Sequence, residues 1–162
     1  MAGINGLALA FRAQQNQRIY KFSVLVKDTA DTTQNQQYAG LPATANAPGV
    51  MGVLTEHFVE PNYFVPQGTN PATVTGTTPV LYNLAGRGLP LQVNGVARCI
   101  AAGAVSQGDV LVVADNYGRV NNTGNLSLAA GTKIFPVGVA QNSTQNANDT
   151  VSVLLNFAPA VA

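Results

Sequence analysis

The sequence IYKFSVLVK at residues 19–27 has the alternation of a half-buried β-strand. Every second residue on one side of the extended chain is large and apolar, namely Tyr20, Phe22, Val24 and Val26. The opposite side carries Lys21, Ser23 and Lys27. This pattern predicts a strand over residues 19–27 that has one buried face and one exposed face.

Further strands are predicted at short spacing along the chain, with turn-forming residues between them. They cover residues 50–59, 80–84, 91–101, 109–114, 119–121, 134–141 and 150–157. In the last of these strands the alternation points four side chains inward: Val151, Val153, Leu155 and Phe157. DNYG at residues 115–118 is typical of a hairpin turn in which Gly118 takes a positive φ. The chain is therefore predicted to be all-β, as a small β-barrel or sandwich with long loops.

The two ends of the chain differ in organisation. Residues 1–18 show no alternation and are predicted to form an extended N-terminal arm, so strands are expected to begin at Ile19 and the fold to survive deletion of residues 2–16. Residues 19–162 are predicted to form a single β domain, with a loop-rich half at 19–89 and a compact β unit at 90–158. Within the first half, the polar residues 28–48 are predicted to form a long loop.

The composition indicates a component of an assembly. Only 9% of the residues are charged, against roughly 25% in an ordinary soluble domain. Such a surface can pack against neighbouring subunits with little cost for desolvating ions. A net charge of +1 supplies no basic patch for a phosphate backbone, so no nucleic-acid partner is expected. The apolar runs are far shorter than the roughly 20 residues that cross a bilayer, so no membrane partner is expected either.

The residues that could carry chemistry are few and scattered. His57 is the only histidine, and a zinc site needs several convergent nitrogen or sulfur ligands, so no metal is expected and His57 is predicted to lie on the surface or between subunits. Cys99 is the only cysteine and is predicted to be a small buried apolar group. No nucleophile signature surrounds His57, Cys99 or Asp109. We therefore expect no enzyme activity, no catalytic residue and no cofactor.

A series of short motifs runs through the C-terminal half: GVARC at 95–99, AVSQGDVLV at 104–112, GRV at 118–120, PVGVAQ at 136–141 and DTVSVLL at 149–155. Over roughly residues 90–157 this series resembles the capsid decoration, or cement, proteins of tailed bacteriophages. In that family a Gly-Asp-x-Val strand start, a Gly-x-Val hairpin exit and a Gly-x-Ala strand before a valine-rich last strand build a small β unit.

The resemblance implies a structural virion protein on the outer surface of the capsid. Its function would be to clamp neighbouring capsid subunits and so stabilise the capsid lattice. The implied partners are the major capsid protein and further copies of the chain itself, commonly as a homotrimer. A phage tail or fibre module that binds a host surface is the alternative, and a small hydrolase that uses His57 is a more distant one.

Aromatic and arginine side chains are enriched in the cores of protein interfaces, which suggests the contact residues of this chain. Five residues are predicted as capsid or subunit contacts: Phe11, Arg12, Arg18, Tyr63 and Phe64. For Tyr63 and Phe64 an ordinary core position is equally compatible with the sequence. The apolar side chains of residues 1–18 are predicted to dock on a neighbouring subunit, because they find no partner pattern in their own segment.

Overall fold

The computed structural model describes residues 8–13, 16–27, 38–65 and 83–161. Within these residues the chain forms β-strands and no helix, which confirms the predicted all-β class, and no described helix could therefore span a membrane. The first five strands are β1 (Ala8–Ala13), β2 (Val24–Lys27), β3 (Tyr38–Gly40), β4 (Val50–Leu54) and β5 (Gly88–Gln92). The others are β6 (Val96–Ile100), β7 (Val110–Val113), β8 (Val120–Asn122), β9 (Lys133–Ile134), β10 (Pro136–Ala140), β11 (Thr150–Leu155) and β12 (Ala160–Val161).

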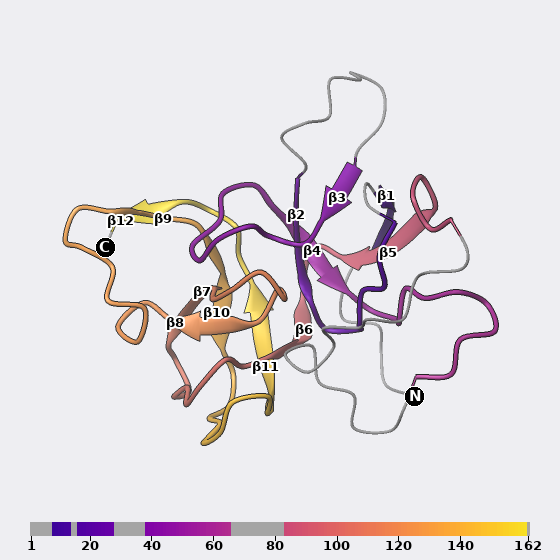
Figure 1. Cartoon of the computed structure of the whole chain (residues 1–162). Helices are drawn as coiled ribbons and strands as arrows, with labels where there is room; N and C mark the ends of the chain where they lie inside the picture. Colours follow the sequence, from indigo (N-terminus) through magenta and orange to yellow (C-terminus); the bar gives the residue numbers. More distant parts are fainter. Residues whose placement is uncertain (1–7, 14–15, 28–37, 66–82, 162) are drawn as a thin grey trace.

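The first five strands close into a barrel in the order β1-β3-β2-β4-β5, so a small barrel, one of the two expected architectures, is present (Figure 1). β1 closes it, because it pairs antiparallel with β5 from Ala8 opposite Gln92 to Arg12 opposite Gly88, and parallel with β3. Each of four strands contributes large buried side chains to one apolar cluster: Phe11, Leu25, Leu54, Leu89 and Leu91.

The prediction that strands begin at Ile19 is wrong, because β1 lies inside the segment predicted to be an arm. Phe11 and Ala13 are 5% and 1% exposed and belong to the core of the barrel. The sequence of β1, ALAFRA, is apolar at nearly every position, so it has no alternation that would reveal a strand. Residues 1–7 of the predicted arm lie outside the described residues.

The strand predicted over residues 19–27 is broken in its middle. Phe22 has a φ of 73°, and its N–H donates to the carbonyl of Leu54 at 2.7 Å. Only residues 24–27 form β2, while Ile19 pairs with Phe58 in an isolated antiparallel bridge. The alternation of apolar side chains is real, but a left-handed residue turns the chain between the two paired parts.

Other predicted segments also differ in detail, and the strand expected at 50–59 ends at Leu54. The strand expected at 91–101 is divided between β5 and β6 by a turn at Gly95, where φ is 75°. The loop expected at 28–48 contains β3, and its residues 28–37 lie outside the described residues. Of the strand expected at 80–84, residues 80–82 lie outside the described residues and Leu84 is buried without strand structure.

The C-terminal strands form a second sheet in the order β6-β11-β10-β7-β8, and a parallel bridge between Ala101 and Val120 links its two ends. On β11, Val151 and Val153 are fully buried, and Leu155 and Phe157 pack partly buried against the same core, as predicted. The expected burial of the lone cysteine in this core is also confirmed. Strands β9 and β12 pair as a separate two-stranded ribbon at the left of Figure 1.

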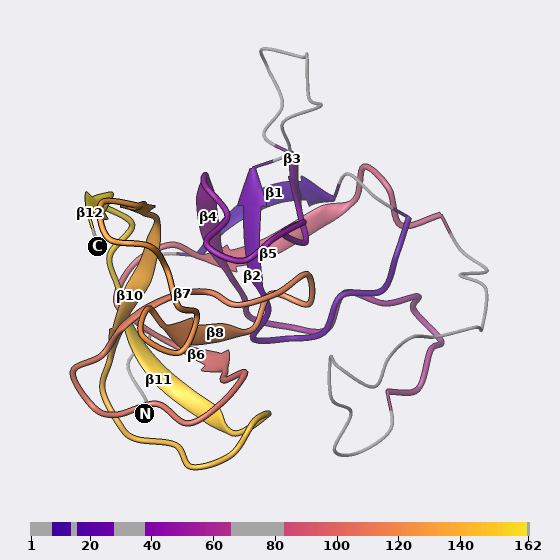
Figure 2. The ribbon, with the colours of Figure 1, turned by 60° about the vertical axis from the view of Figure 1, so that its left-hand side comes forward.

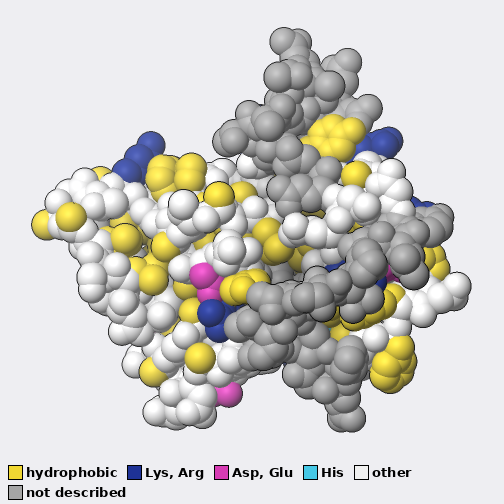
Figure 3. Space-filling model, in the orientation of Figure 1, with side chains coloured by type: hydrophobic (Ala, Val, Ile, Leu, Met, Phe, Trp, Pro, Cys, Tyr) yellow, Lys and Arg dark blue, Asp and Glu magenta, His cyan; other side chains and the backbone are white. Residues whose placement is uncertain are grey.

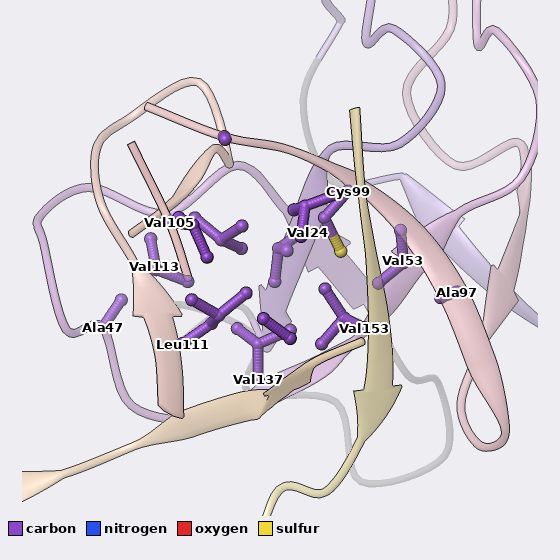
Figure 4. Close-up of a cluster of buried hydrophobic side chains, with 14 of the residues drawn as sticks. Val24, Ala47, Val53, Ala97, Cys99, Val105, Leu111, Val113, Val137 and Val153 are labelled. Atoms are coloured by element: carbon purple, nitrogen blue, oxygen red, sulfur yellow. The ribbon is translucent and has the colours of Figure 1, made fainter. Parts of the chain in front are cut away.

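The barrel and the second sheet lie side by side in both ribbon views (Figure 2) and share a core between them. Leu25 points into the barrel, whereas its neighbours Val24 and Val26 pack into the cluster of the second sheet. Figure 4 shows Val24 and Val53 within that cluster, whose other labelled side chains include Leu111, Val113, Val137 and Val153. A strand with two buried faces needs apolar residues at consecutive positions, which explains the run of valine and leucine in β2.

Candidate functional site

A buried ion pair joins two connections of the barrel, the one from β1 to β2 and the one from β4 to β5. The bridge between Ile19 and Phe58 holds two distant segments antiparallel through hydrogen bonds of 2.9 and 2.8 Å. Beside it, Arg18 donates from Nε and Nη2 to the two carboxylate oxygens of Glu60, both at 2.7 Å. The two side chains are only 8% and 10% exposed. The hydrogen bonds to Glu60 raise the pKa of Arg18, and the two-point contact holds both side chains in one geometry.

Two tyrosines lie close to this pair. The guanidinium of Arg18 lies 3.8 Å from the ring centroid of Tyr63, within the range of a cation–π contact. Burial and a hydrogen bond with Tyr63 raise the pKa of Tyr20 to about 12. Directly after Tyr63 in the chain, Phe64 is 84% exposed. A rigid ionic and aromatic base therefore supports a large apolar side chain in solvent.

His57 belongs to the same group of side chains. Its Nδ1 accepts a hydrogen bond from the N–H of Lys21 at 3.2 Å, and its ring meets that of Tyr20 edge-on, with centroids 5.6 Å apart. Burial, together with the positive charge of Lys21, lowers the pKa of His57. We name Arg18, Tyr20, His57, Glu60, Tyr63 and Phe64 together the aromatic–ionic cluster.

The structure thus brings together three of the five predicted contact residues: Arg18, Tyr63 and Phe64. It separates Phe11 from them, because this side chain fills the barrel and is not available on the surface of the folded chain. Arg12 is exposed on the barrel wall, where Nη1 donates to the carbonyl of Gly86 at 3.3 Å.

Sequence reasoning missed two members of the cluster, Tyr20 and Glu60. The alternation assigned Tyr20 to the buried face of a strand and gave it no further role. Glu60 lies 42 residues from Arg18, and no local pattern couples residues at that separation. The Pro-Asn pair at 61–62, a turn signal just after Glu60, is the one local hint that the carboxylate and Tyr63 lie close together.

The cluster exposes one large apolar side chain, Phe64, next to buried polar and aromatic groups. Its carboxylate is neutralised by a bidentate guanidinium, and within the described residues no three His, Cys, Asp or Glu side chains gather as a metal site would require. In the core, burial raises the pKa of Cys99 to about 12, which keeps it a thiol and a poor nucleophile.

In sequence, the chain matches no protein-family model and no curated protein. In structure, it is similar to the N base of the head fibre gp8.5 of bacteriophage phi29, with a TM-score of 0.54 and 14% identity. The similarity covers 95% of this chain and 98% of that chain. The two chains share a fold. Both the barrel and the second sheet belong to the shared part, since so little of either chain lies outside it.

Proposed function

We propose that this chain is a structural protein of a phage head that attaches to the outside of the head through protein–protein contacts. The observation that carries the proposal is the fold that it shares, over nearly its whole length, with the base of a phage head fibre. The motif resemblance to decoration proteins at residues 90–157 favours the same kind of particle. The low charge fraction and the mostly uncharged face in Figure 3 agree with a surface that packs against other subunits.

The aromatic–ionic cluster is the proposed contact with the head. Burying one phenylalanine side chain on binding contributes about 1.5–3 kcal/mol, and Phe64 is almost wholly exposed before binding. Because Arg18 and Tyr63 already hold the adjacent backbone in place, little further ordering is needed when Phe64 enters a pocket.

In the finer form of the proposal the chain is a decoration protein. It would clamp neighbouring subunits of the major capsid protein from the outer surface and work as a homotrimer. The alternative of a phage tail or fibre module gains support from the similarity to the base of a head fibre. Copy number separates a decoration protein from a tail module, since a decoration protein occurs many times per particle and a tail module only a few times.

The test is co-sedimentation of the purified chain with heads that lack it, followed by quantification of the chain in native particles. We expect Phe64→Asp to abolish binding and Val161→Asp, at an exposed site on β12 that is not among the predicted contacts, to leave it unchanged. Light scattering on the free chain checks the homotrimer separately. Failure of the wild-type chain to bind heads, or its absence from purified particles, would overturn the proposed function.

A further inference from the structure

Four apolar side chains form a row across the outer face of the second sheet. Leu154 on β11 lies opposite Val96 on β6 and opposite Val139 on β10, and Val139 in turn lies opposite Val110 on β7. Val96, Leu154 and Val110 are 43%, 46% and 42% exposed, and Val139 is partly buried. Neighbouring strands lie about 4.8 Å apart, so the row is about 14 Å long. We name these four residues the apolar row.

The fold does not require the apolar row. The core of the second sheet is built by the alternate residues of the same strands, including Ala97, Leu111 and Val153 (Figure 4). The outward positions beside Leu154 on its own strand are polar, as expected for a face in water, and are occupied by Ser152 and Thr150. A continuous apolar row that crosses several strands is a feature of interaction surfaces.

One cation borders the apolar row. Arg98 is the next outward residue after Val96 on β6, lies opposite Ser152 and is exposed. Arg98 forms no ion pair with a carboxylate of the described residues, in which the ion pairs are Arg18 with Glu60 and Arg119 with Asp115.

We propose that this face docks an apolar segment of another protein that carries a carboxylate beside its apolar residues. The valine and leucine side chains would cover the apolar part of the segment, and Arg98 would receive the carboxylate. The charge argues against a second copy of this chain, because β6, β7, β10 and β11 contain Arg98 and no acidic residue, so a symmetric contact of this face would offer Arg98 no carboxylate from these strands. The area argues the same way, since a stable dimer needs about 800 Å² per partner, and three half-exposed side chains with one partly buried side chain supply much less. This surface lies on a different sheet from the aromatic–ionic cluster, and the inference does not depend on the proposed function.

The test uses a random peptide library displayed on yeast, with the full wild-type chain as bait and Leu154→Asp as the counter-selection bait. We expect the enriched peptides to combine consecutive apolar residues with Asp or Glu. The best peptide should bind Arg98→Glu at least about tenfold more weakly than wild type, as loss of one charge-assisted contact requires. Changing its acidic residue to Lys should restore binding to Arg98→Glu. Val161→Asp, on an exposed strand outside the apolar row, is the matched control and should bind like wild type.

The outcomes are distinguishable because thermal unfolding of each variant shows whether it is folded. No enrichment, enrichment without an acidic preference, or equal binding to Leu154→Asp would overturn the proposal. A wild-type dimer that Leu154→Asp dissociates would also overturn it, because the occupant would then be a second copy.

Discussion

The carbonyl of Gly118 accepts a hydrogen bond from the N–H of Val24 at 2.8 Å. Gly118 closes the hairpin between β7 and β8, and Val24 begins β2 of the barrel, so this bond joins the second sheet directly to the barrel. Gly118 has a φ of +74°, and a Cβ at this position would lie 2.5 Å from the carbonyl oxygen of Val24. The barrel and the hairpin therefore meet at a point where only glycine fits.

Replacing this glycine should destabilise the protein strongly. We expect Gly118→Ala to lower the free energy of unfolding by about 4 kcal/mol, through the strained φ and the clash with Val24 together. Gly86→Ala separates the two effects, because Gly86 has a φ of +78° and no atom within 4 Å of the added Cβ. It should cost only about 1–2 kcal/mol. Urea unfolding measures both values, and equal losses would mean that the contact with β2 does not matter.

The ion pair of Arg18 and Glu60 should show strong coupling. Glu60→Gln leaves a nearly buried guanidinium without its carboxylate, so we expect a loss of about 3 kcal/mol. Arg18→Met should cause a similar loss, but the double variant should lose much less than the sum of the two. A double-mutant cycle by denaturant unfolding gives the coupling free energy. Additive losses would show that the two side chains do not depend on each other.

Phe11 should contribute to stability and its neighbour Arg12 should not. Phe11 fills the barrel at 5% exposure, and its truncation to Ala should cost about 3–5 kcal/mol. Arg12 is exposed on the other face of β1, so Arg12→Ala should change stability by less than about 0.5 kcal/mol. Thermal unfolding distinguishes the two variants. If Phe11→Ala were as stable as the wild type, Phe11 would not be part of the barrel core, and the prediction that residues 8–13 belong to a detachable arm would stand.

Stability should fall in mild acid because of His57. Folding lowers the pKa of this residue, so the neutral imidazole is the favoured form. Its contribution is complete above the unfolded pKa of about 6.5 and is lost as the pH falls through that value towards the lower folded pKa. His57→Asn keeps a hydrogen-bond acceptor for the N–H of Lys21 but does not titrate. We expect the wild type to lose stability relative to His57→Asn between pH 7 and pH 5, measured by urea unfolding; parallel pH profiles would contradict this.

Parts of the fold were predictable because their cause is local. The turn at residues 115–118 depends on Asp115 accepting the N–H of Tyr117 at 3.0 Å and on a positive φ at Gly118, and both residue types signal such a turn. The break at Phe22 was not predictable, because an aromatic residue takes a positive φ only when contacts elsewhere enforce it. In this protein the N–H of Phe22 donates to the carbonyl of Leu54 on β4, and this distant contact holds Phe22 in that conformation.

The candidate site was predictable only in its residue types. Arginine and aromatic residues suggested contacts, and three of the residues named do gather in the aromatic–ionic cluster. Phe11 is predicted to contact a partner but lies in the barrel core. The sequence does not separate the two positions, because a side chain that packs in a barrel and one that packs on a partner are equally apolar. Glu60 was missed, because its significance depends on a segment far away in the chain.

By itself the sequence determined which side chains of the last strand share a face, where the turn at residues 115–118 lies and that the chain is all-β. Period-two alternation and turn chemistry are properties of a few consecutive residues, so no distant contact is needed to read them. Only the tertiary structure decided what each face meets. Closing β1 onto β5 created a barrel interior for Leu25, and docking the second sheet buried Val24 on the other face of the same strand. These choices depend on which distant strands pair, and pairing is set by the packing of the whole chain rather than by any one segment.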